Sequence, residues 1–84
     1  MGSIVDRCRQ LLERARRNPA GLRFRELREL SECFGFQLTR QRGSHHIFKR
    51  QGYQKLLNLQ ASKGMAKAYQ VRQLLLALEE LGIL

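Results

Sequence analysis

The sequence has few cysteines, few acidic residues and no long hydrophobic run. Cysteine occurs only twice, at Cys8 and Cys33, which is too few for a disulfide framework or a zinc-binding set. Both lie in apolar helical surroundings, so we expect two separate core residues in a reducing compartment. No apolar run is long enough to cross a membrane and no signal peptide is visible, so the sequence predicts a cytoplasmic protein.

The shortage of acidic residues gives the chain a strong positive charge. Its 84 residues include 16 Lys and Arg against 7 Asp and Glu, a formal net charge of +9. So basic a balance in a short chain indicates a polyanionic partner, most often nucleic acid. The length is that of one small domain, residues 1–84, and the sequence shows no internal repeat or low-complexity segment.

Hydrophobic periodicity predicts three helices and three strands. Apolar residues recur at helical spacing over about 4–17, 25–34 and 69–80. Two strand-like runs flank a turn and a third falls at about 56–60, whereas the small polar residues 61–67 indicate a loop. We expect an α+β fold in which all three helices cover one face of a three-stranded antiparallel sheet and leave the other face open. The expected core comprises Leu27, Leu30, Phe34, Phe36, Phe48, Leu74, Leu75 and Leu78.

Polar chemistry is concentrated in the run RQRGSHHIFKR, which extends over residues 40–50 and contains both histidines. Gly43 suits a tight turn because glycine adopts positive φ without strain. The run therefore predicts a β-hairpin whose second strand opens with His45 and His46. Its four cations and one hydroxyl residue are expected to bind RNA; they are Arg40, Arg42, Lys49, Arg50 and Ser44.

The two adjacent histidines are expected to lie on opposite faces of the sheet. They cannot readily share one ion, so we expect no metal and no other cofactor. His46 has the parity of Phe48, the larger apolar group, and should face the helices as a buried, hydrogen-bonded residue. His45 should then lie on the open basic face, together with Ile47 and Lys49.

A histidine among cations has a definite use in RNA cleavage. RNA carries a 2′-hydroxyl beside each phosphate, and cleavage needs a base to take its proton or an acid for the leaving 5′-oxygen. Histidine titrates near neutrality and can serve in either role. Neighbouring cations such as Arg42 or Lys49 would stabilise the charge that builds on phosphorus, with Ser44 as a hydrogen-bonding positioner. Such a site needs no metal.

The motif Gly43-Ser44-His45-His46-x-Phe48-Lys49, preceded by Phe36-x-Leu38-x-Arg40, resembles the signature of HicA-type toxins, also called the YcfA-like family. The resemblance covers roughly residues 24–80 and makes the helix at 4–17 an addition. It implies a fold similar to double-stranded-RNA-binding domains. It also implies a toxin of a type II toxin–antitoxin system, an mRNA interferase inhibited by a HicB-like antitoxin. The essential histidine of the Gly-Ser-His motif corresponds to His45, with His46 as a second candidate.

The sequence also departs from the family pattern. Many members carry a basic segment with proline and histidine after the third strand, where this chain has residues 60–65, GlnAlaSerLysGlyMet. Two other functions stay open from the residues alone. One is a non-catalytic RNA-binding module on the same fold, and the other is a protein-interaction domain that uses the open face for an acidic partner.

Overall fold

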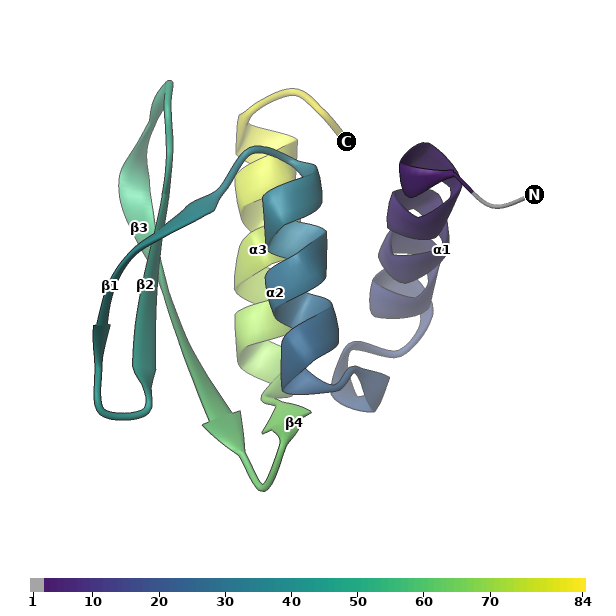
Figure 1. The fold of residues 1–84 in the computed structure, drawn as a ribbon. Helices are drawn as coiled ribbons and strands as arrows, with labels where there is room; N and C mark the ends of the chain where they lie inside the picture. The colour runs from purple at the N-terminus through teal and green to yellow at the C-terminus, as the bar shows by residue number, and fades with distance from the viewer. Residues whose placement is uncertain (1–2) are drawn as a thin grey trace.

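A computed structural model describes residues 3–84, which form helices and strands on one continuous chain (Figure 1). The first two residues of the predicted domain lie outside the described residues. The elements in chain order are α1 (Ile4–Arg17), a short 3₁₀ helix η1 (Pro19–Gly21), α2 (Phe24–Cys33), β1 (Gln37–Arg42), β2 (His45–Arg50), β3 (Tyr53–Ser62), β4 (Met65–Ala66) and α3 (Ala68–Glu80).

The sheet is antiparallel with strand order β1-β2-β3-β4. It has four strands rather than the three predicted, because the segment 61–67 is not a loop. β3 continues to Ser62, and a turn at Lys63 and Gly64, both with positive φ, reverses the chain into β4. Main-chain hydrogen bonds join this turn to the chain before α2, from Phe24 N to Gly64 O and from Ala66 N to Leu22 O, both 3.0 Å. Such distant partners are not visible in local composition.

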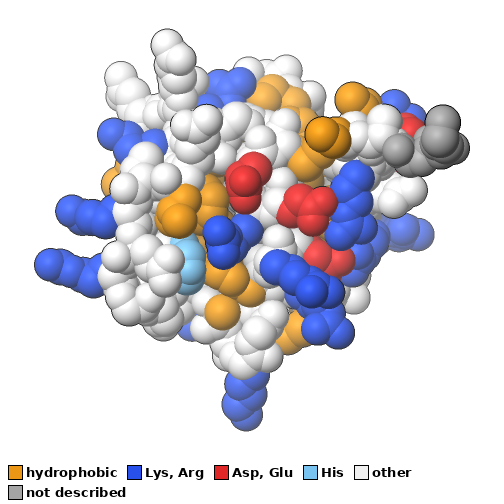
Figure 2. Space-filling view, viewed as in Figure 1, with side chains coloured by type: hydrophobic (Ala, Val, Ile, Leu, Met, Phe, Trp, Pro, Cys, Tyr) orange, Lys and Arg blue, Asp and Glu red, His pale blue; other side chains and the backbone are white. Residues whose placement is uncertain are grey.

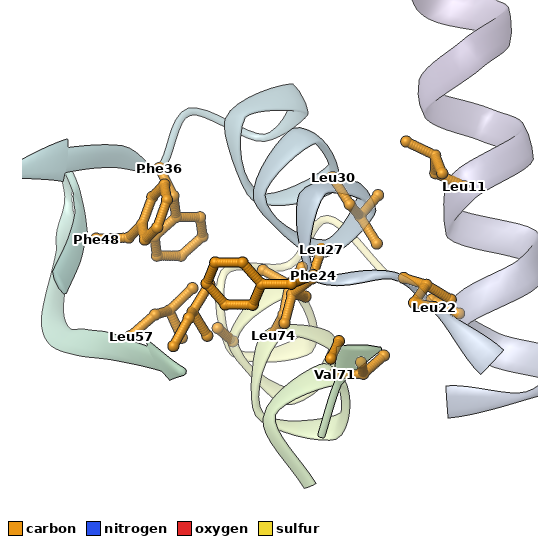
Figure 3. Packing of buried hydrophobic residues seen from close by; sticks show 14 of the residues in the cluster. Leu11, Leu22, Phe24, Leu27, Leu30, Phe36, Phe48, Leu57, Val71 and Leu74 are labelled. Carbon is orange, nitrogen blue, oxygen red and sulfur yellow. The ribbon is translucent and has the colours of Figure 1, made fainter. Parts of the chain in front are cut away.

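The core lies between the sheet and the pair α2 and α3, as the α+β prediction requires (Figures 1 and 3). Six of the eight predicted core residues are buried: Leu27, Leu30, Phe36, Phe48, Leu74 and Leu78. Phe34 and Leu75 are only half-buried and pack at the margin of the core. Phe34 is the C-cap residue of α2 and therefore lies just beyond the last helical residue.

The first helix does not lie against the sheet, as the sequence predicted it would. α1 lies on the far side of the α2–α3 pair and forms a third layer (Figure 1). It packs on α2 and η1 through Leu11 and Ala15, which are fully buried. The expectation that all three helices cover the sheet face is therefore wrong for α1, because α2 and α3 already occupy that face.

The two cysteines are also placed differently from the prediction. Cys8 of α1 and Cys33 at the end of α2 form a disulfide, and they are 25 residues apart in sequence. The antiparallel course of the two helices brings the start of α1 beside the end of α2. Two isolated cysteines in a sequence carry no sign of such a pairing, and the inference of a reducing compartment from their number no longer holds.

A second connection joins α1 to the start of α2. Arg14 donates to both carboxylate oxygens of Glu26, at 2.6 and 3.2 Å, and the backbone N–H of Arg23 donates to Glu26 at 2.9 Å. The Arg14 guanidinium is the main reason that the pKa of Glu26 lies below its ordinary value. Arg7 pairs with the more exposed Glu29 at 2.9 Å. Figure 2 shows acidic and basic side chains interleaved on the helical side of the molecule.

Candidate nucleic-acid interface

The candidate site is built on the hairpin formed by β1 and β2. Residues Gly43 and Ser44 make the turn between these strands, and Gly43 has φ +58°. A Cβ at Gly43 would meet no atom within 4 Å, so glycine is favoured there by its backbone conformation and not by a lack of space. The turn places His45 at the first position of β2, as the sequence predicted.

His45 lies on the open face of the sheet, with its side chain exposed. Its Nδ1 is 3.2 Å from the amide oxygen of Asn58 on β3. In the sheet register, His45 is directly opposite Arg42 on β1 and Gln60 on β3. The histidine is therefore accessible to a large substrate, held on one side by an amide and flanked on the other by a strand that carries a cation.

His46 has the opposite orientation, which agrees with the parity argument. The side chain is half-buried, and its ring centroid lies 4.9 Å from that of Phe24, the first residue of α2. Its Nδ1 lies 3.0 Å from the carbonyl oxygen of Ser44, a distance that fits donation by an Nδ1–H. These contacts connect the hairpin to the helical layer.

Three of the predicted RNA-contacting cations are exposed on the hairpin. Arg40 is opposite Ile47, Arg42 is opposite His45, and Lys49 follows Ile47 on the same side of β2 as His45. The ion pairs found among residues 3–84 use Arg7, Arg14 and Lys55 as their cations. Figure 2 shows basic side chains projecting from the sheet side of the molecule. The hairpin thus offers positive charge around His45.

Arg50 is used differently from the other three cations. It is half-buried, and its Nε donates to the carbonyl oxygen of Phe34 at 2.7 Å. Its Nη1 donates to the carbonyl oxygen of Gln51 at 3.0 Å. Because these bonds engage the guanidinium with the main chain at the end of α2, we do not include Arg50 in the proposed RNA-contacting set.

Two amide residues of β3 belong to the site and were missed from the sequence. Asn58 contacts His45, and Gln60 donates from Nε2 to the Ser44 hydroxyl oxygen at 3.0 Å. The backbone N–H of Gln60 donates to the side chain of Gln70 on α3 at 3.0 Å, and Gln70 is buried. The only signal in the sequence is that Asn58 and Gln60 alternate with leucines, which places them on the open face.

The chemistry available here is that of imidazole, hydroxyl, amide and cations. Among residues 3–84, no three His, Cys, Asp or Glu side chains come together as ligands for a metal ion. Within the same residues, no helix combines the length and hydrophobicity needed to span a membrane. One surface hollow lies away from the hairpin, where it is lined by Arg14, Arg17 and Leu22. An open basic strand face suits a polymer better than a small enclosed ligand.

Comparison with known proteins gives one result. The family model described as the HicA toxin of bacterial toxin–antitoxin matches residues 24–83, which run from α2 through α3 and include the whole hairpin. α1 lies outside the match. No curated protein and no solved structure matches the chain. Because the match extends over most of the chain, this protein belongs to the HicA toxin family.

Proposed function

We propose that the protein is a metal-independent mRNA interferase, an endoribonuclease that uses His45 for proton transfer. Its family consists of toxins of toxin–antitoxin systems, which generally act as mRNA interferases. The observation that carries the proposal is the exposed His45 ring, hydrogen-bonded through Nδ1 to Asn58 and opposite Arg42. We propose mRNA as the substrate and the cytoplasm as the place of action; this proposal rests on the family and not on the state of the cysteines.

The reaction uses the nucleophile that RNA itself provides. The 2′-oxygen attacks the adjacent phosphorus, and the bond from phosphorus to the 5′-oxygen breaks. The proton of the 2′-hydroxyl passes to a base, and the leaving 5′-oxygen receives a proton. His45 Nε2 can take the first proton or supply the second, and water exchanges the other one. Arg42 or Lys49 stabilises the charge on the phosphorane. The products are a 2′,3′-cyclic phosphate and a 5′-hydroxyl, and no metal is needed.

His46 is the second candidate, and its surroundings favour a structural role. Its ring packs on Phe24, and its Nδ1 is engaged by the Ser44 carbonyl. Packing of an aromatic pair and a hydrogen bond to the main chain both stabilise the folded hairpin. We therefore assign proton transfer to His45 and support of the hairpin to His46.

The proposal is tested by incubating the purified protein with mixed RNA in the presence of EDTA and mapping the cut ends. We expect cleavage of RNA, with cyclic phosphate and 5′-hydroxyl ends, and no cleavage of DNA, which lacks the 2′-hydroxyl. Retention of RNA without cleavage would instead support the RNA-binding module. Cleavage that disappears with EDTA would contradict the metal-independent mechanism.

The cations of the hairpin should set the salt dependence of RNA binding. Replacing Arg40 and Arg42 by glutamine should flatten the log–log slope of affinity against salt by about one to two units, because fewer counterions are released. The control is the double variant Arg16→Gln/Arg17→Gln on α1, which loses the same charge from an exposed helix end outside the sheet. Equal slopes for the two variants would move the RNA-contacting surface away from the hairpin.

A HicB-like antitoxin is the partner that we propose for the same surface. A cover with acidic groups over the His45 face would exclude RNA and compete for its cations. The Arg40→Gln/Arg42→Gln variant should therefore also bind the antitoxin more weakly than the α1 control does. An antitoxin that binds both variants equally, and leaves RNA cleavage unaffected, would contradict this arrangement.

A further inference from the structure

We propose that Asn58 is a positioning residue for His45, and that its amide oxygen makes Nε2 the atom that exchanges protons with RNA. The inference rests on the proposed function, because it concerns the same site. It assigns the two ring nitrogens separate roles. Nδ1 holds the ring in place through Asn58, and Nε2 is directed toward the substrate.

The contact is set by the register of two paired strands. Asn58 is directly opposite Ile47, and His45 is directly opposite Gln60, so the two side chains meet diagonally on one sheet face. His45 Nδ1 and Asn58 Oδ1 are 3.2 Å apart. Diagonal neighbours on a sheet are within reach of each other when one side chain is long or aromatic. The contact between His45 and Asn58 therefore forms within the regular strand pairing of β2 and β3.

An amide oxygen can only accept a hydrogen bond, so Nδ1 must carry the hydrogen. The neutral ring then has its lone pair on Nε2, and the protonated ring donates from Nε2. The reversed amide would direct its NH₂ group at Nδ1, which fits only a ring that is unprotonated there. With the oxygen facing the ring, the contact persists in both protonation states of a proton-transfer cycle.

The position of Asn58 is itself well determined. Its neighbours Leu57 and Leu59 are buried on the helical side of β3, which fixes the backbone between them. Two residues further on, Gln60 is held by Gln70 of α3 through its backbone and holds the Ser44 hydroxyl through its side chain. β3 thus fixes both the His45 ring and the turn residue that precedes it.

An amide is better suited to this place than a carboxylate. In Ser-His-Asp sites an aspartate orients the histidine and adds a negative charge. Here Arg42 is opposite His45, and Lys49 lies on the same side of β2. A carboxylate would neutralise part of the charge that a phosphate backbone needs, whereas Asn58 orients the ring without that cost.

Asn58→Leu tests the inference, since leucine keeps the size of the side chain and removes the acceptor. We expect kcat to fall about tenfold or more, short of the 10²–10⁴-fold loss of general acid–base catalysis itself, while KM changes little. Asn58→Asp restores an acceptor oxygen and should recover most of kcat. The matched control Gln54→Leu makes the same kind of change at an exposed position of β3 and should behave as the parent.

Nitrogen NMR of the neutral His45 ring provides a readout that does not depend on cleavage. The parent, Asn58→Asp and Gln54→Leu should show the hydrogen on Nδ1, and Asn58→Leu should lose that preference. The inference is overturned if Asn58→Leu keeps the parent tautomer or the parent kcat while His45→Ala is inactive. If His45→Ala also cleaves as the parent does, the proposed function fails instead, and the catalytic part of the inference fails with it.

Discussion

Replacing His45 by alanine should leave the protein folded and lower its rate of RNA cleavage by about 10²–10⁴-fold, the usual effect of losing general acid–base catalysis. The side chain is exposed and contributes little to the core. RNA affinity should change far less than the rate, because backbone cations supply most of it. Cleavage rates and melting curves of the parent and the variant measure the two effects separately.

His46→Ala is the matched comparison and should show the opposite balance. Removing a half-buried ring that packs on Phe24 and contacts the Ser44 carbonyl should lower stability by about 1–2 kcal/mol, within the usual range for single substitutions. Cleavage should persist at temperatures where the variant is folded. A folded, inactive His46→Ala would reverse the two assignments, and parent-like rates for both variants would rule out histidine catalysis.

Replacing Glu26 by glutamine should lower the free energy of unfolding by about 2 kcal/mol at neutral pH. This loss of stability is larger than that expected for an exposed ion pair and smaller than that expected when a fully buried pair is broken. The Glu26 side chain is 11% exposed and that of Arg14 is 41% exposed, so solvent screens one partner only. Glu29→Gln is the control, because both side chains of its pair with Arg7 are over two-fifths exposed, and it should cost less than about 1 kcal/mol.

The stabilisation by Glu26 should depend on pH, and its direction follows from the pKa of that carboxyl group. Hydrogen bonds from Arg14 and from the Arg23 backbone lower the pKa of Glu26 in the folded protein. The folded state therefore binds the proton less readily than the unfolded state, and the stabilisation is present above the ordinary glutamate range. It is lost as pH falls through the lowered pKa. The free energies of unfolding of the parent and of Glu26→Gln should differ at pH 7 and become equal in acid. A difference that is the same at every pH would contradict an ionic origin of the stabilisation.

The local part of the site followed from the sequence. A turn glycine between two alternating runs defined the hairpin, and strand parity placed His45 and His46 on opposite faces. Both inferences depend only on residues within ten positions of one another, where period and turn chemistry are strong guides. The helices and most of the core followed in the same way from the spacing of leucines and phenylalanines.

Most of the features that sequence analysis missed depend on contacts between distant segments. Cys8 meets Cys33 only because two helices run antiparallel, and α1 forms a third layer only because α2 and α3 fill the sheet face. β4 pairs with the end of β3, and the β3–β4 turn region is also hydrogen-bonded to the distant residues Leu22 and Phe24. Asn58 reaches His45 through the register of β2 and β3, which strand prediction alone does not fix.

α1 is joined to α2 at both ends, covalently from Cys8 to Cys33 and by the ion pair of Arg14 with Glu26. A helix held in this way cannot fray away from the domain while the disulfide is intact. Its amide hydrogens should therefore exchange with solvent together with those of α2, as one cooperative unit of the folding landscape. The helix outside the family match should therefore unfold together with the matched domain, and not before it.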